Sequence, residues 1–182
     1  DVNPEGRLNI LTVDDKIQEL GRFPNFNDAN KGFKTITSTN GSNQISSNDF
    51  SSTDNWTGGE IVIRKNPWVH DKHIITASSS SSVSFNANPS KYPVSADYGF
   101  FIQNHIKTLD QYGEWYHDKA AKKLYVFLGN PSNIPKIEIG TKNNLIQLSW
   151  GVSHIHIIDL ELKGANSNGV IINEGNHVLV TN

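Results

Sequence analysis

The stretch Ser153–Val180, SHIHIIDLELKGANSNGVIINEGNHVLV, repeats one short apolar pattern that is interrupted by Asn and Gly. Apolar pairs return after 23 or 24 positions: Ile155 and Ile157 before Val178 and Val180, and Ile146 and Leu148 before Val170 and Ile172. A fixed period in the low twenties with very short strands indicates a solenoid, in which each coil stacks on the next. Leucine-rich repeats share this period but need a leucine consensus that is absent here. The pattern therefore predicts a parallel β-helix.

Each coil is expected to hold three short strands, the third formed by Leu160 and Leu162. The side chains predicted to point inward are Ile155, Ile157, Leu160, Leu162, Val170 and Ile172. Gly suits corner positions with φ > 0, so we expect corners at Gly164, Gly169 and Gly175. Asn side chains can stack as ladders in such a column. His154 and His177 should stack in adjacent coils, about 5 Å apart.

The chain shows fewer than two coils, whereas a β-helix needs about three before its core supports itself. The sequence also contains no Met, so Asp1 is not a translation start. We therefore expect a processed form or fragment of a protein that continues beyond residue 182.

The residues before the coils read as short strands and turns. A hairpin is predicted over residues 8–20 and a polar loop over 37–59, with one short strand around Phe50. Further strands are predicted over residues 60–85, where a serine run forms a loop tip, and in a hairpin with its tip at Lys119–Lys123. The predicted fold is all-β: N-terminal elements over 1–36, an inserted β-rich domain over 37–134, and coils over 135–182. The sequence leaves open whether the insertion is a barrel or a sandwich.

Composition excludes several functional classes. The net charge is -2, so no basic surface indicates nucleic acid. No apolar run approaches a membrane span. Cysteine is absent, which excludes disulfides, thiolate catalysis and Cys-ligated zinc. Neither a phosphate-binding loop nor a Gly-x-Ser-x-Gly elbow occurs, and we predict no cofactor and no metal site.

A series of motifs resembles a known family. In order they are Arg22-Phe23-Pro24-Asn25, Leu109-Asp110, Gly113-Glu114-Trp115-Tyr116, Asp118 and Leu124-Tyr125-Val126, followed by the coils. This order is similar to that of secreted bacterial proteins of the right-handed parallel β-helix, pectate-lyase-like superfamily, and it spans most of the chain. The resemblance implies a glycoside hydrolase or polysaccharide lyase whose catalytic carboxylates lie on later coils, or a surface protein without activity.

Several residues are candidates for function, each with a structural alternative. Trp56 and Trp68 are the candidates for carbohydrate contact, because each lies beside polar or loop sequence, but core packing is favoured for both. Asp159 and Glu161, two apart on one predicted strand, have the spacing of a carboxylate pair, but a solvated outer face is favoured. Glu114 and Asp118 are expected to shape a hairpin, with Trp115 and Tyr116 in a core. The pairs His154/His177 and His70/His73 could each bind a metal ion, but neither has a third ligand at the spacing of a metal site, so a structural or exposed role is favoured.

Three functions remain open. The first is the N-terminal scaffold of a secreted protein that acts on or binds polysaccharide or oligosaccharide, with catalytic residues outside residues 1–182. The second is a non-catalytic bacterial surface adhesin, or a cargo protein exported by secretion machinery, with a β-helix stalk. The third is a carbohydrate-binding module. All three predict a secreted or cell-surface location.

Overall fold

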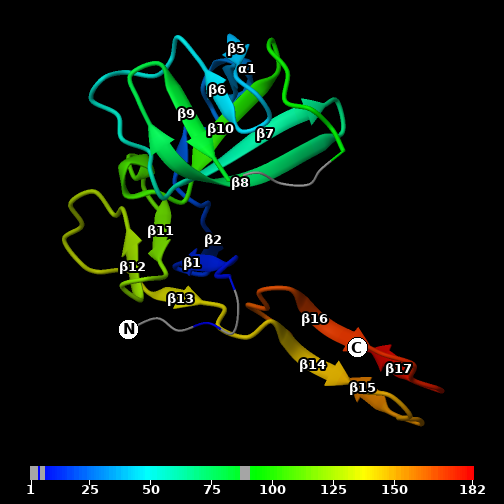
Figure 1. The fold of residues 1–182 in the computed structure, drawn as a ribbon. Helices are drawn as coiled ribbons and strands as arrows, with labels where there is room; N and C mark the ends of the chain where they lie inside the picture. The colour runs from blue at the N-terminus through cyan, green and yellow to red at the C-terminus, as the bar shows by residue number, and fades with distance from the viewer. Residues whose placement is uncertain (1–3, 5–6, 87–90) are drawn as a thin grey trace. The chain divides into compact units, whose positions relative to one another are not determined.

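The computed structural model describes residue 4 and residues 7–86 and 91–182. It is mostly β-structure with antiparallel sheets, and it divides into two compact units (Figure 1). Unit 1 comprises residues 1–19, 119–123 and 131–182, and unit 2 comprises residues 20–118 and 124–130. The helical segments of the described residues are α1 (Ala29–Gly32) and the 3-10 turn η1 (Ile106–Thr108). No helix there has the length and hydropathy to cross a membrane.

Unit 2 contains an eight-stranded antiparallel sheet with the order β3-β10-β7-β8-β9-β6-β5, in which β4 also pairs with β10. Its strands are β3 (Arg22–Phe23), β4 (Lys34–Thr35), β5 (Ser38–Thr39), β6 (Gln44–Ser46), β7 (Glu60–Asn66), β8 (Val69–Ser78), β9 (Ser82–Phe85) and β10 (Gly99–Gln103). β4 and β5 are consecutive: the first pairs with β10 and the second with β6. This segment therefore closes the sheet on itself, so the insertion is barrel-like rather than a sandwich.

The barrel interior is filled by buried apolar side chains. Strand alternation places Ile61 and Ile63 of β7 opposite Ile102 and Phe100 of β10, and all four are 0% exposed. The other core members are Ile36, Ile45, Phe50, Trp56, Ile75, Val83, Phe85 and Val94. The strand expected around Phe50 is wrong, because the nearest strand is β6 and Phe50 follows a turn at residues 48–49 after it. Its ring still packs into the core, 5.2 Å from that of Phe100.

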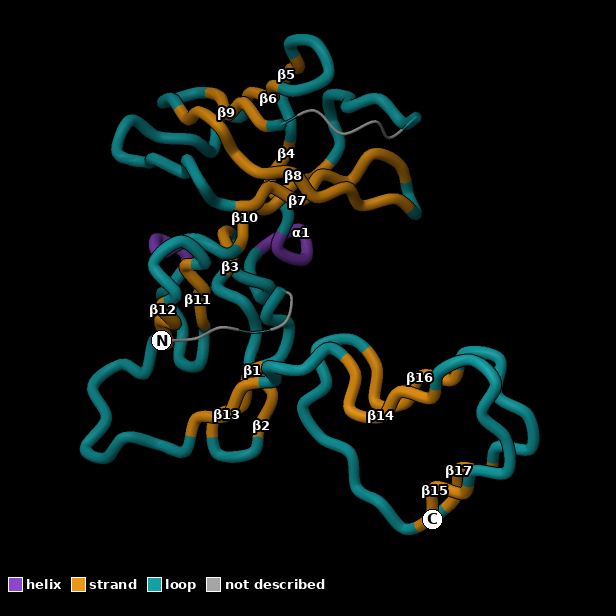
Figure 2. Tube along the Cα trace, turned by 60° about the horizontal axis from the view of Figure 1, so that its bottom comes forward, coloured by secondary structure: helices purple, strands orange, loops and turns teal. Residues whose placement is uncertain are grey.

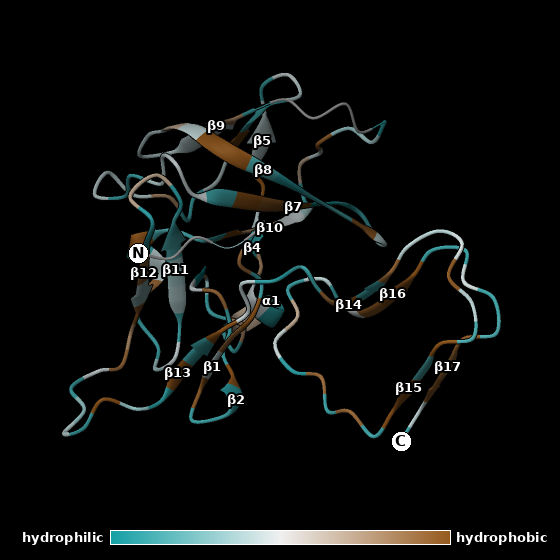
Figure 3. Cartoon of the chain, turned by 90° about the horizontal axis from the view of Figure 1, so that it is seen from below, coloured by the Kyte–Doolittle hydropathy of each residue, from teal (hydrophilic) through white to brown (hydrophobic). Residues whose placement is uncertain are grey.

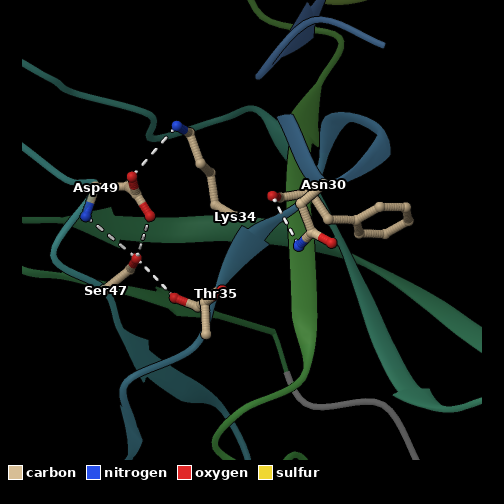
Figure 4. A network of polar contacts seen from close by, with 6 residues as sticks. Asn30, Lys34, Thr35, Ser47 and Asp49 are labelled. Carbon is tan, nitrogen blue, oxygen red and sulfur yellow. Dashed lines mark hydrogen bonds and ion pairs between the residues drawn. The ribbon is translucent and has the colours of Figure 1, made fainter. Parts of the chain in front are cut away.

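Polar contacts hold the closing segment in place (Figure 4). The Ser47 hydroxyl donates to the Thr35 carbonyl at 2.8 Å and accepts from the Asp49 N–H at 3.2 Å. Lys34 forms an ion pair with Asp49 at 3.2 Å. These contacts connect β4 to the loop after β6, on either side of the closure.

The Arg22-Phe23-Pro24-Asn25 motif has a structural role in unit 2. The Phe23-Pro24 bond is cis. The Arg22 guanidinium donates to the carbonyls of Pro24 and Gly32 and lies 3.7 Å from the centroid of the Phe101 ring. Arg22 thus ties the turn and α1 to the outer face of β10.

Unit 1 begins with a three-stranded antiparallel sheet of β13 (Ile137–Ile139), β1 (Leu11–Val13) and β2 (Lys16–Ile17). The β1–β2 hairpin confirms the predicted turn at Asp14 and Asp15, which have φ of 48° and 62°. The predicted hairpin is formed by β11 (Trp115–Asp118) and β12 (Lys123–Val126); residues 115–118 and 124–126 of it belong to unit 2.

The C-terminal part of unit 1 winds into stacked turns of chain (Figure 2). β14 (Asn144–Leu148) pairs in parallel with β16 (Asn168–Ile172), and β15 (His156–Ile158) pairs in parallel with β17 (Leu179–Thr181). Ile146 faces Val170 and Ile157 faces Val180, so the registers read from the sequence are confirmed. The described residues hold these two ladders but not a solenoid of several coils.

Side chains also stack in register between the two turns. Asn168 Nδ2 donates to Asn144 Oδ1 at 2.9 Å, which is the predicted asparagine ladder. The rings of His154 and His177 lie 4.8 Å apart with an interplanar angle of 5°, as expected. Both contacts follow from the registers of 24 and 23 positions.

Three predicted details of the coils are wrong. Leu160 and Leu162 form no strand, because the segment one coil earlier is β13, which pairs with β1. Leu160, Leu162 and Ile172 are 58%, 37% and 42% exposed rather than buried in a core. Gly169 lies within β16, and Gly175 lacks the positive φ found at Gly164. The other corners with positive φ are formed by Gly151, His154, Asp159, Glu174 and His177.

Candidate functional site

The candidate site in unit 2 is the tip of the β7–β8 hairpin, where Trp68 is 76% exposed. The Trp68 N–H donates to Asn66 Oδ1 at 3.0 Å, and Arg64 Nη2 donates to the Pro67 carbonyl at 3.3 Å. Both bonds lie within the turn, so they fix the backbone that carries the indole. The structure therefore places one of the two predicted carbohydrate contacts on a well-defined exposed turn.

The other predicted contact, Trp56, lies in the core and is 3% exposed. Its ring is stacked on Phe23 with centroids 5.0 Å apart and meets His105 edge-on at 5.6 Å. The ring offers no free face to a sugar in this structure, which is the packing role weighed as its alternative. The polar sequence around Trp56 does not indicate burial, because the residues that cover its ring, Phe23 and His105, are distant in sequence.

A buried polar cluster lies on the core side of the hairpin, close to its turn. Lys65 Nζ is 3.0 Å from Asp71 Oδ2, and their side chains are 3% and 16% exposed. His73, 2% exposed, lies on the same face of β8 as Asp71, and its Nδ1 donates to the Asn86 carbonyl at 3.0 Å. Burial first, and the positive charge of Lys65 second, lower the pKa of His73. The sequence held no specific signal for this cluster.

Glu114 explains the Gly113-Glu114-Trp115-Tyr116 motif structurally. Its Oε2 accepts the backbone N–H groups of Asp110 and Gln111, each at 2.9 Å, and its Oε1 accepts that of Arg22 at 3.4 Å. Burial raises the pKa of Glu114, and these hydrogen bonds oppose that rise. The carboxylate holds a loop together. Trp115 is 1% exposed, which confirms its expected core role.

Neither histidine pair is arranged to share a metal ion. His70 is exposed and His73 is buried, because alternation along β8 places them on opposite faces. The rings of His154 and His177 lie in nearly parallel planes, whereas a metal ligated by an imidazole nitrogen lies close to the ring plane. Among the described residues, no group of three His, Cys, Asp or Glu could hold a metal ion.

Asp159 and Glu161 do not form a catalytic pair on a strand. Asp159 occupies a corner with φ of 55°, and the segment that follows is irregular. Glu161 is bound to Lys163 at 2.8 Å, with both side chains 75% exposed. The solvated arrangement favoured by the sequence therefore describes them.

Unit 1 contains a cavity of about 610 Å³ where the β1–β2–β13 sheet adjoins the first coil. Its apolar lining includes Ile17, Leu145 and Leu162, and its charged lining includes Asp15 and Glu138. Both carboxylates are paired with Lys136, at 3.3 Å and 2.9 Å. No aromatic side chain lines the cavity, so it offers a sugar ring no stacking surface.

Two comparisons with known proteins give matches. A family model described as "GH141 insertion domain" matches residues 34–128. A solved structure named "Glycoside hydrolase" aligns with a TM-score of 0.63 and 20% identity over 82% of this chain and 30% of that chain. At that identity the likeness concerns the fold, and the chain spans less than a third of that protein. No curated protein sequence matches.

Proposed function

This chain belongs to the GH141 insertion-domain family, and we propose that it is the N-terminal scaffold of a secreted β-helix protein that acts on polysaccharide or oligosaccharide. The observation that carries the proposal is the match of residues 34–128, followed after β13 by two parallel ladders at β-helix spacing. The fold shared with a glycoside hydrolase over most of the chain supports it.

The proposed fold is the start of a right-handed parallel β-helix that carries the insertion. Its proposed parts are N-terminal elements over 1–36, an inserted domain over 37–134 and the first coils over 135–182. The 24- and 23-residue registers, the Asn144–Asn168 ladder and the His154–His177 stack all support coil stacking. Further coils of a longer protein would cover the exposed Leu160, Ile172 and Val180.

The proposed role of this part is to support and bind, while the chemistry takes place elsewhere. Glycoside hydrolysis needs two carboxylates about 5–9.5 Å apart across the scissile bond. The candidate acids described above serve other purposes: Glu114 holds a loop and Glu161 is paired with Lys163. We therefore place the catalytic acids in other coils and assign glycan contact in this part to Trp68.

The test is an activity assay of the longest natural form of the protein on a panel of plant and bacterial polysaccharides. Reducing ends released without an unsaturated product would support hydrolysis, whereas absorbance from a new double bond would indicate a lyase. Absence of both products, together with adhesion of the protein to cells, would favour the alternative of a surface adhesin or exported cargo protein.

A further inference from the structure

We propose that the tip of the β7–β8 hairpin is a binding site for carboxylate-bearing polysaccharide, in which Trp68 stacks on a sugar ring and Arg64 binds a uronate carboxylate. The proposal rests on the proposed function and adds the class of glycan and the residues that recognise it. Neither the family match nor the structural match assigns a ligand to the insertion.

The turn at the tip of the hairpin presents the Trp68 side chain to solvent. Trp68 follows Pro67, whose ring fixes φ, and two hydrogen bonds from Trp68 N–H and Arg64 Nη2 close the turn. Because the backbone of this turn is fixed before binding, less conformational entropy is lost when the turn binds a ligand.

The hairpin is also stiff below its tip. The buried Lys65–Asp71 pair at 3.0 Å links the two strands on the core side. On the outer side, His70 is stacked on Phe33 with ring centroids 5.8 Å apart. The two strands that lead to Trp68 are therefore held by contacts on both faces of the hairpin.

The surroundings of Trp68 suit a sugar better than a protein surface. A protein interface centres on a contiguous apolar patch with a polar rim. Around Trp68 the side chains are polar instead: Asn66, Arg64 and His70 lie within four positions. The negative face of the indole attracts the C–H groups of a pyranose ring, and the neighbouring donors can bind its oxygen atoms.

Charge favours an acidic glycan. Residues 64–72 carry three cationic side chains and one acidic side chain, in a chain with a net charge of -2. The acidic one, Asp71, faces the core and is paired with Lys65. Strand alternation leaves Arg64 and Lys72 on the outer face. Lys72 lies 4.0 Å from Glu60, whereas Arg64, which donates one Nη2 hydrogen to the Pro67 carbonyl, has further guanidinium donors for a carboxylate.

The experiment measures binding of the protein to polygalacturonate and to its fully methyl-esterified form, which keeps the sugar ring and removes the charge. Trp68→Ala and Arg64→Gln are the test variants. Trp150→Ala is the matched control, because Trp150 is similarly exposed, at 71%, but lies in the coil. Thermal unfolding verifies that each variant keeps its fold.

The proposal expects Trp68→Ala and Arg64→Gln each to weaken binding of polygalacturonate about tenfold or more, and Trp150→Ala to leave it unchanged. Esterification and high salt should weaken wild-type binding. Equal affinity for both glycan forms, equal effects of Trp68→Ala and Trp150→Ala, or no binding of polygalacturonate would overturn it. Cleavage of polysaccharide by the longer protein would survive any of these results, so the proposed function is tested separately.

Discussion

The barrel of unit 2 and the coils of unit 1 use similar short strands but bury them differently. In the barrel, Ile61, Phe100 and Ile102 are 0% exposed, whereas in the coils Leu160 and Val180 are 58% and 52% exposed. Figure 3 shows hydrophobic residues along both regions. A closed antiparallel sheet completes its own core, but each coil is covered only by its neighbours. Burial thus depends on how the strands close and not on how apolar they are.

The largest expected difference comes from truncating one apolar side chain in each region. Phe100→Ala should lower the free energy of unfolding by about 3–5 kcal/mol because it leaves a cavity in a closed core. Val180→Ala should change it by less than about 0.5 kcal/mol because the side chain is already solvated. Urea unfolding of both variants would measure this contrast, and equal losses would mean that the coil interior is covered in solution.

The next effect concerns a buried carboxylate of unit 2. Glu114→Ala should cost about 2–3 kcal/mol, because it removes the acceptor of the backbone N–H groups of Arg22, Asp110 and Gln111. Glu114→Gln keeps one oxygen and should cost less. Chemical denaturation distinguishes the two, and similar losses for both would show that the negative charge, not the oxygen, holds the loop.

The coils have their own sensitive point at Gly140. A Cβ at this position would collide with the carbonyl oxygen of Gly164 in the next turn, so Gly140→Ala should cost about 1–3 kcal/mol. Gly169→Ala is the matched control, since its nearest neighbour would be at 3.9 Å. Hydrogen exchange at Asn166 and Ser167, whose N–H groups donate to Lys142 and Asn143 carbonyls, would measure the loss. Unchanged exchange in Gly140→Ala would contradict the close stacking.

The smallest expected effect is a pH dependence confined to the barrel. The fold lowers the pKa of His73, so the unfolded chain binds this proton more readily. Stability from this group is present above about pH 6.5, the unfolded value, and declines as pH falls below it. His73→Asn keeps a donor for the Asn86 carbonyl and should flatten the pH profile of thermal unfolding between pH 7 and 5. An identical slope in wild type and variant would rule out this role.

The sequence predicted the coils better than the barrel, for a physical reason. The pairing of Ile146 with Val170 repeats at a fixed spacing, and stacked coils turn that spacing directly into contact. Nothing local indicates that β10 lies between β3 and β7, or that β4 and β5 close the sheet. The same limit applies to the site: Trp56 and Trp68 both have polar neighbours in sequence, and only long-range pairing buries one and exposes the other.

The hydrogen bonds between Asn9 and Asn166 join residues that are 157 positions apart. In synthesis from the N-terminus, Asn9 must therefore wait while the whole insertion leaves the ribosome. Once the insertion has folded, the chain between Asn9 and Asn166 acts as a shorter loop. This lowers the entropy cost of forming their contact. Domains generally fold as units during synthesis. We therefore expect the barrel to fold before the coils stack, and variants that destabilise the barrel to delay the Asn9–Asn166 contact.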